Sequence, residues 1–117
     1  MADQIEILLP KTRFNEQTNF TASIKFRDRA TAAASTPTTV HWRLDNLTTK
    51  DTITEWTLLT SPAASMTLLI DRTQTKIEGN SNRVERKEIT IKADDGLSTQ
   101  AIGRVIFQVH NIYGIKT

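Results

Sequence analysis

The chain has 117 residues, of which 38% are hydrophobic and 24% charged, and its net charge is +2. These values predict one folded domain over residues 1–117, and the interspersed acids and bases argue against a nucleic-acid partner, which favours a clustered basic patch. The absence of cysteine excludes disulfides, thiolate metal sites and cysteine nucleophiles. No apolar stretch approaches the about 20 residues of a membrane span. The N-terminal M-A-D-Q-I-E-I-L-L-P has no basic region, so we expect neither a membrane segment nor a signal peptide.

Apolar and polar residues alternate along most of the chain, and this period of two predicts β-strands. The clearest case is F-T-A-S-I-K-F-R, in which four apolar residues share one face. Residues 28–37 predict a loop. In chain order, the apolar rows that share a face are Ile5, Ile7 and Leu9; Phe20, Ala22, Ile24 and Phe26; Val40, Trp42 and Leu44; Trp56 and Leu58; Met66, Leu68 and Ile70; Ile89, Ile91 and Ala93; and Val105, Phe107 and Val109.

These rows predict about seven strands separated by turns. Helical periodicity is absent beyond a single turn, so the fold class is all-β. Many short alternating strands in one chain of this length are typical of a two-sheet β-sandwich with antiparallel strands and Greek-key connections.

The polar residues His41, Arg43 and Asp45 share the face opposite Val40, Trp42 and Leu44. Residues four apart on a strand lie about 13 Å apart, so His41 cannot bond Asp45, and a His–Asp pair needs a carboxylate from a neighbouring strand. We expect a solvated polar face on which Arg43 pairs with an acid across strands.

The two tryptophans receive different interpretations. Trp42 is flanked by Val40 and Leu44 on its own face, which predicts a core anchor rather than a ligand-stacking ring. Trp56 has Glu55 and Thr57 as neighbours, and two interpretations stay open. It is either a second core anchor or the edge of an interface.

No residue pattern indicates catalysis or a bound cofactor. The chain lacks G-x-S-x-G, a P-loop and G-x-G-x-x-G, and it has only two histidines. Asp94-Asp95-Gly96 lacks the further oxygen ligands of a calcium loop and is typical of a hairpin turn between alternating runs. We therefore expect no catalytic, cofactor-binding or metal-binding residues.

The densest charge run covers residues 82–88. Its alternating signs favour a solvated strand with cross-strand pairs, or an edge strand that charges protect from aggregation; the alternative is a docking surface for a charged partner. The charged residues of the run are Arg83, Glu85, Arg86, Lys87 and Glu88.

More apolar residues are present than one core face can accept. In each of the pairs Leu58-Leu59 and Leu68-Leu69, one side chain must point outward if the strand is regular. A contiguous exposed apolar patch marks an interface, which predicts assembly with itself or with a partner. The other residues in this group are Leu8, Ile106, Ile112 and Ile115.

Four stretches between Trp42 and Gly114 resemble a family of small immunoglobulin-like virion proteins of tailed bacteriophages. They are V-H-W-R-L-D-N-L-T-T, T-E-W-T-L-L-T-S-P-A-A-S-M-T-L-L-I, N-R-V-E-R-K-E-I-T-I-K-A-D-D-G-L and V-I-F-Q-V-H-N-I-Y-G. The resemblance implies that the sandwich is immunoglobulin-like. The chain departs from antibody domains because it lacks the cysteine pair and a tyrosine at the tyrosine-corner position.

The resemblance also implies a role. Such proteins resemble capsid decoration (cement) proteins, and also modules attached to tails or connectors. We expect a structural, non-enzymatic protein that is made in the host cytoplasm and docks on the major capsid protein or another virion protein, with self-association on the particle. The alternatives are a tail or connector component and a carbohydrate-binding module for host adhesion.

Overall fold

We describe a computed structural model of the chain, covering residues 3–79, 82–94 and 99–111. Its regular elements are all strands, which confirms the all-β prediction. They are β1 (Gln4–Leu8), β2 (Arg13–Asn15), β3 (Phe20–Arg27), β4 (Thr39–Asn46), β5 (Asp51–Leu59), β6 (Ser65–Ile70), β7 (Val84–Asp94) and β8 (Thr99–His110).

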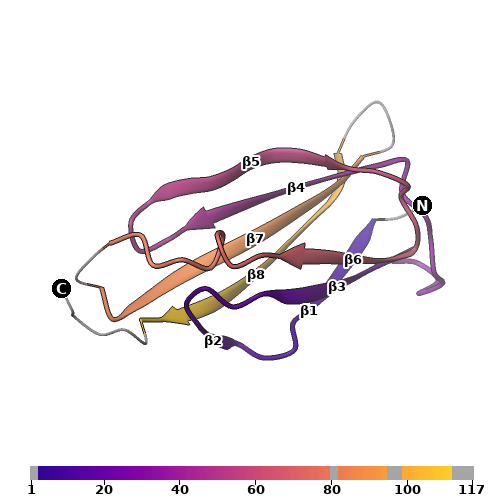
Figure 1. Cartoon of the computed structure of the whole chain (residues 1–117). Coiled ribbons are helices and arrows are strands. Elements are labelled where there is room, and N and C mark those ends of the chain that lie inside the picture. The colour runs from indigo at the N-terminus through magenta and orange to yellow at the C-terminus, as the bar shows by residue number, and fades with distance from the viewer. Residues whose placement is uncertain (1–2, 80–81, 95–98, 112–117) are drawn as a thin grey trace.

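The strands form two sheets that pack as a sandwich (Figure 1). One sheet has the order β1-β3-β6, and the other has the order β2-β8-β7-β4-β5. Neighbours are antiparallel except for β2 and β8, which are parallel. The immunoglobulin-like, Greek-key form of the sandwich stays a prediction. It is supported by this order, because β4, β7 and β8 adjoin as strands C, F and G do in immunoglobulin domains.

The core lies between the sheets and is built from the predicted apolar rows. Buried residues of β3, β4, β6, β7 and β8 alternate with outward ones, as the period of two requires. Trp42 is only 6% exposed, which confirms it as a core anchor. At one end of the core, the Phe14 and Phe20 rings stack at 3.9 Å, and Phe107 meets both edge-on.

The sequence missed one strand. The described residues form eight strands where about seven were predicted, and the additional one is β2, which contains only Arg13, Phe14 and Asn15. Three residues are too few for an alternating pattern to show. The strand forms because it pairs with β8, with Phe14 opposite Val109, and this pairing buries the Phe14 ring.

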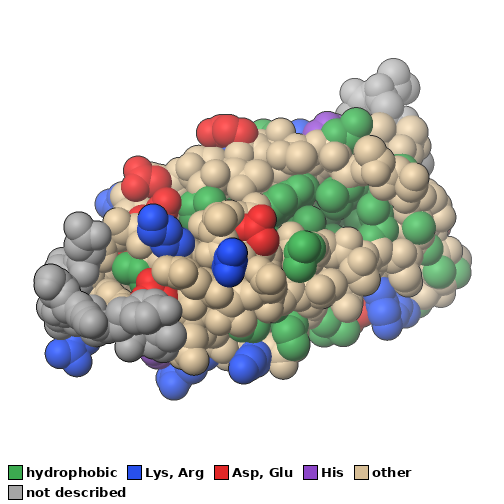
Figure 2. All heavy atoms as spheres, in the orientation of Figure 1, with side chains coloured by type: hydrophobic (Ala, Val, Ile, Leu, Met, Phe, Trp, Pro, Cys, Tyr) green, Lys and Arg blue, Asp and Glu red, His purple; other side chains and the backbone are tan. Residues whose placement is uncertain are grey.

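The two long sides of the sandwich differ. On one side β1 packs against β8 at Gly103, where a Cβ atom would lie 2.9 Å from Ile5 Cγ2. On the other side lie the outer edges of β5 and β6, each of which pairs with only one neighbour among the described strands. Hydrophobic side chains gather in the band between these two strands (Figure 2). One side is therefore closed where the Ile5 side chain packs on Gly103, and the other presents strand edges and apolar atoms.

Candidate protein-docking face

The outer face of the five-stranded sheet carries most of the exposed apolar surface. Seven large hydrophobic side chains are exposed in the described part of the chain. Alternation and strand register place five of them on this face, while Leu8 and Leu69 lie on the outer face of the other sheet. The five are Trp56, Leu58, Val84, Ile102 and Ile106.

Trp56 is the largest of these side chains and is 39% exposed. Lys92 Nζ lies 4.5 Å from the centroid of its ring, and Arg43 Cζ lies 5.5 Å from it. Both distances fall within the range of cation–π attraction. This position answers the question about Trp56: it is not a second core anchor, but an exposed ring held by two cations.

Register places further apolar groups beside Trp56. Ile102 faces Lys92, Lys92 faces His41, and His41 faces Leu58, so these four residues form one row across β8, β7, β4 and β5. Leu58 and Ile102 are 53% and 52% exposed. The row next to Trp56 therefore begins and ends with an exposed aliphatic side chain.

Arg43 is fixed in place by an acid of its own strand and by a hydroxyl of β5. Its guanidinium donates to Asp45 twice, from Nε at 3.0 Å and from Nη2 at 2.9 Å, and to Thr52 Oγ1 at 2.9 Å. These bonds with Asp45 raise the pKa of Arg43 above its ordinary value, so it stays charged. The expectation that Arg43 pairs with an acid across strands is thus wrong. Its acid partner, Asp45, lies two residues along β4, where the β4–β5 register shifts.

His41 does find a carboxylate on a neighbouring strand. Its Nδ1 lies 3.3 Å from Asp94 Oδ2 of β7, and both side chains are partly buried. Within the described residues, no hydroxyl is hydrogen-bonded to the ring. The expected separation of His41 from Asp45 is consistent with these contacts, since Asp45 binds Arg43 instead.

The charge run at residues 82–88 is not the solvated or edge strand that its alternating signs favour. β7 lies between β8 and β4, and Glu85 and Lys87 are fully buried. Arg86 and Glu88 alternate with them on the outward face. Two of the five charged residues are therefore unavailable to a partner, and Arg83, Arg86 and Glu88 remain accessible.

Glu85 is buried because the β6–β7 loop supplies donors to its carboxylate. Oε1 accepts from Glu78 N at 2.8 Å and from Asn46 Nδ2 at 2.9 Å. Oε2 accepts from Gly79 N at 2.7 Å and from Asn82 Nδ2 at 2.8 Å. Burial alone would raise the pKa of Glu85, but these four hydrogen bonds outweigh it and hold the pKa below its usual value.

Lys87 is the matching buried cation. Its Nζ donates to the carbonyl oxygens of Gln74 at 2.9 Å and Lys76 at 2.6 Å. Burial lowers the pKa of Lys87, while the charges of Glu78 and Glu85 oppose that shift. Glu85 and Lys87 together fasten the β6–β7 loop onto β7, and we call this set of bonds the loop anchor.

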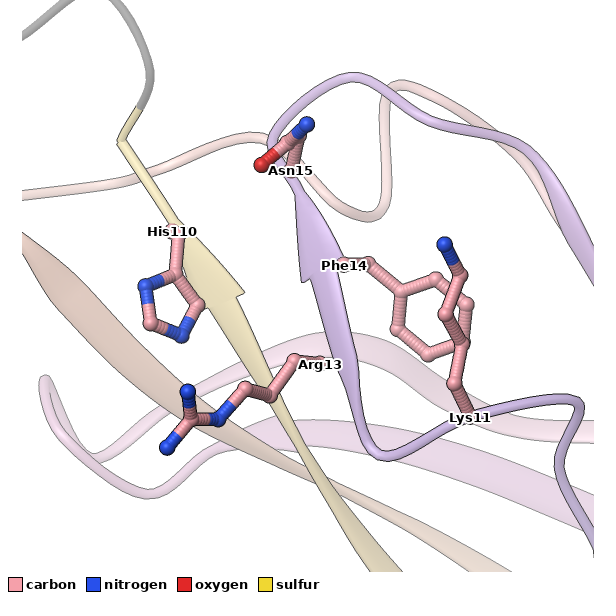
Figure 3. Close-up of a pocket in the computed structure, with 5 residues that line it drawn as sticks. All are labelled: Lys11, Arg13, Phe14, Asn15 and His110. Carbon is pink, nitrogen blue, oxygen red and sulfur yellow. The ribbon is translucent and has the colours of Figure 1, made fainter.

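A shallow pocket of about 240 Å³ lies where β2 meets the end of β8. Figure 3 shows that Arg13 and His110 lie on one side of β2, whereas Lys11 and the Phe14 ring lie on the other. His110 Nε2 is buried and has no hydrogen-bond partner among the described residues. The cations that line the pocket do not converge on one point, so it does not have the geometry of an anion site.

Metal and membrane motifs are absent from the described residues. No three of their His, Asp or Glu side chains cluster as metal ligands would, and none of them form a helix with the length and apolar character of a membrane span. The Asp95-Gly96 part of the predicted turn lies outside the described residues, although β7 and β8 pair antiparallel up to Asp94 and Thr99. Ile112 and Ile115 also lie outside them.

Sequence reasoning missed Lys92 and Ile102 as members of this face. The signal was present for Ile102, because it has the opposite parity to the inward row of Val105, Phe107 and Val109.

No family model, curated protein or solved structure matches the chain.

Proposed function

We propose that the chain is a non-enzymatic binding module that docks on another protein through the outer face of its five-stranded sheet. The observation that carries the proposal is Trp56, an exposed ring flanked by Arg43 and Lys92 and bordered by Leu58 and Ile102. Tryptophan and arginine are enriched among the residues that dominate binding energy in interfaces, and exposed aliphatic groups around them exclude water. We call Trp56, Leu58, Ile102, Arg43 and Lys92 the docking face.

We further propose that the partner is the particle of a tailed bacteriophage, most simply the major capsid protein of its head. This part rests on the resemblance of the sequence to immunoglobulin-like virion proteins, and the strand order supports the sandwich that the resemblance implies. A decoration role needs a rigid domain with one adhesive face, and the docking face fits that need. A tail or connector location uses the same face and is the alternative within this class.

The test measures binding of the purified chain to three preparations: shells that lack it, tails with connectors, and a glycan array. Saturable binding to shells, with a rise in their thermal stability, supports decoration. Binding to tails instead supports the tail or connector alternative. Binding to glycans alone supports the adhesion alternative, in which Trp56 contacts a sugar. Binding to none of the three rejects the proposal.

Two matched substitutions then test the face itself. Trp56→Ala should weaken binding by about 30-fold or more, which corresponds to the 2 kcal/mol that defines an interface hot spot. Leu58→Ala should weaken it by less, and Leu8→Ala is the control, because Leu8 is equally exposed but lies on the other sheet. Equal losses in Leu58→Ala and Leu8→Ala would contradict docking through this face.

A further inference from the structure

The outer edge of β6 is an unguarded strand edge. Natural proteins protect edge strands with charges, proline or short length, because a free edge can pair with another chain. The other three edges follow this rule: β1 contains Glu6, β2 has only three residues and includes Arg13, and β5 contains Asp51 and Glu55. β6 reads S-M-T-L-L-I and contains neither a charge nor a proline.

The surroundings of β6 are also apolar. Leu69 is 60% exposed, the highest value among the exposed large hydrophobic residues. Met66 on the inward side is only partly buried, although it packs against the core. The band of hydrophobic side chains in Figure 2 runs beside this strand. A strand that pairs with β6 would therefore gain both backbone hydrogen bonds and apolar contact.

We propose that β6 pairs antiparallel with β6 of a second copy of the chain about a two-fold axis, which joins two three-stranded sheets into one. Residues opposite each other in an antiparallel pair point to the same face, so the inward rows of both copies must coincide. The register that pairs all three inward residues places Leu68 opposite Leu68 and Met66 opposite Ile70. On the outer face it places Thr67 opposite Leu69.

A second copy suits this edge better than a charged strand from another protein. β6 has no charge to match such a strand, whereas it opposes no like charges when it meets itself. In the proposed register, Ser65 faces Asp71 of the second copy, and Lys25 lies beside Ser65 on β3. Lys25 of each copy thus falls in the same row as an acid of the other. The two-fold axis repeats this attraction.

The contact should be weak in solution. One strand pair of six residues is a small interface compared with the about 1,600 Å² of a standard stable complex. We therefore expect a concentration-dependent dimer, which many copies on one surface would strengthen. The dimer is measured with the isolated chain, so failure to dimerise would not contradict the proposed docking face. Failure to bind virion parts would likewise not contradict the dimer.

The first experiment is sedimentation velocity of the wild-type chain and two lysine variants up to millimolar concentration. Leu69→Lys should lower the association constant by about 10-fold or more, because a charged edge strand resists pairing. Leu8→Lys is the matched control, since Leu8 is similarly exposed but lies on β1 at the opposite edge of the same sheet, and it should change the constant by less than about 2-fold. A monomeric wild type, or equal losses in both variants, would overturn the proposal.

The second experiment tests the register and uses the absence of cysteine from the chain. In the double variant Thr67→Cys, Leu69→Cys, the cysteine at position 67 of one copy lies opposite the cysteine at position 69 of the other. Their Cα atoms are then about 4.5–5.5 Å apart, a separation that a disulfide accepts. Mild oxidation should give a covalent dimer. The control pair Glu55→Cys, Thr57→Cys on β5 should not, and equal cross-linking there would indicate random collision and contradict the pairing.

Discussion

The most demanding test of the fold is Glu85→Gln in the loop anchor. The glutamine amide keeps the volume of the side chain but replaces one accepting oxygen by an NH₂ group. Of the four donors around the carboxylate, two then face another donor, for example Gly79 N and Asn82 Nδ2. Asn82 can rotate its amide to offer its oxygen, but the Gly79 N–H has no such freedom.

The magnitude follows from these contacts. Hydrogen bonds to a charged group contribute about 1.5–3 kcal/mol each, and a buried donor left without a partner costs about 1–3 kcal/mol. Two bonds lost and one regained by the rotated Asn82 give a destabilisation of about 3 kcal/mol. The loss of the Glu85 charge adds to this, because it removes one of the two carboxylate charges, with that of Glu78, that oppose the lowering of the Lys87 pKa. This is a large part of the about 5–15 kcal/mol of a typical domain.

The assay is equilibrium unfolding in urea, followed by far-ultraviolet circular dichroism and by tryptophan fluorescence, to which the buried Trp42 contributes. With a slope of about 1–3 kcal/mol per molar urea, the midpoint should fall by about 1–3 M. Glu88→Gln is the control, because Glu88 is on the outward face of the same strand, and it should cost less than about 0.5 kcal/mol. A loss below about 1 kcal/mol in Glu85→Gln, or a loss equal to that of Glu88→Gln, would refute the reasoning.

Two further predictions concern acid and the closed side of the sandwich. The pKa of Glu85 is lower in the folded chain than in the unfolded one, so its contribution to the free energy of unfolding is present above about pH 4.3 and is lost as pH falls through the folded value. Urea titrations between neutral and acid pH should therefore show a loss of stability that is smaller in Glu85→Gln than in the wild type. Parallel plots of stability against pH for the two proteins would contradict this prediction. Gly103→Ala places a Cβ atom 2.9 Å from Ile5 Cγ2 and should cost about 1–3 kcal/mol in the same assay, whereas an unchanged midpoint would mean that β1 shifts freely from β8.

The core could be predicted from the sequence because strands carry their burial pattern in a period of two. The rows that include Trp42, Ile91 and Phe107 each have one apolar and one polar face, which leaves only one inward side. β5 is different. Ile53 and Leu59 lie on one face and Trp56 and Leu58 on the other, so the pattern alone could not decide which face is inward.

The loop anchor shows a different limit. Counting back in steps of two from the buried Ile89 reaches Lys87 and Glu85, so parity did place them inward. Their charge argued against burial, because such residues are almost never fully buried unless paired. Most of the groups that offset this cost are backbone amides and carbonyls of the β6–β7 loop, together with the side-chain amides of Asn46 and Asn82. No periodic pattern in the sequence reports where these groups lie.

The same limit applies to the polar residues of the docking face and to the His41–Asp94 pair beside it. His41 meets Asp94, and Lys92 meets Trp56, only through the register of β4 with β7 and β5. A sequence predicts that a strand exists more readily than it predicts which residue of the next strand lies opposite. Arg43 adds a second difficulty, because the irregular β4–β5 register lets it bind Asp45 on its own strand.

The arrangement of these parts separates stability from binding. β7 carries the loop anchor at Glu85 and Lys87, while its other end presents Lys92 to Trp56, roughly 17–24 Å away along an extended strand. Weakening the anchor should therefore unfold more of the chain without changing the affinity of the folded part. The proposed β6 contact lies on the other sheet, so one copy can dock through one sheet and pair with a neighbour through the other. In the proposed decoration role, two weak contacts on separate sheets would together give tight binding to a repeating surface, because the second contact would form at high effective concentration once the first is made.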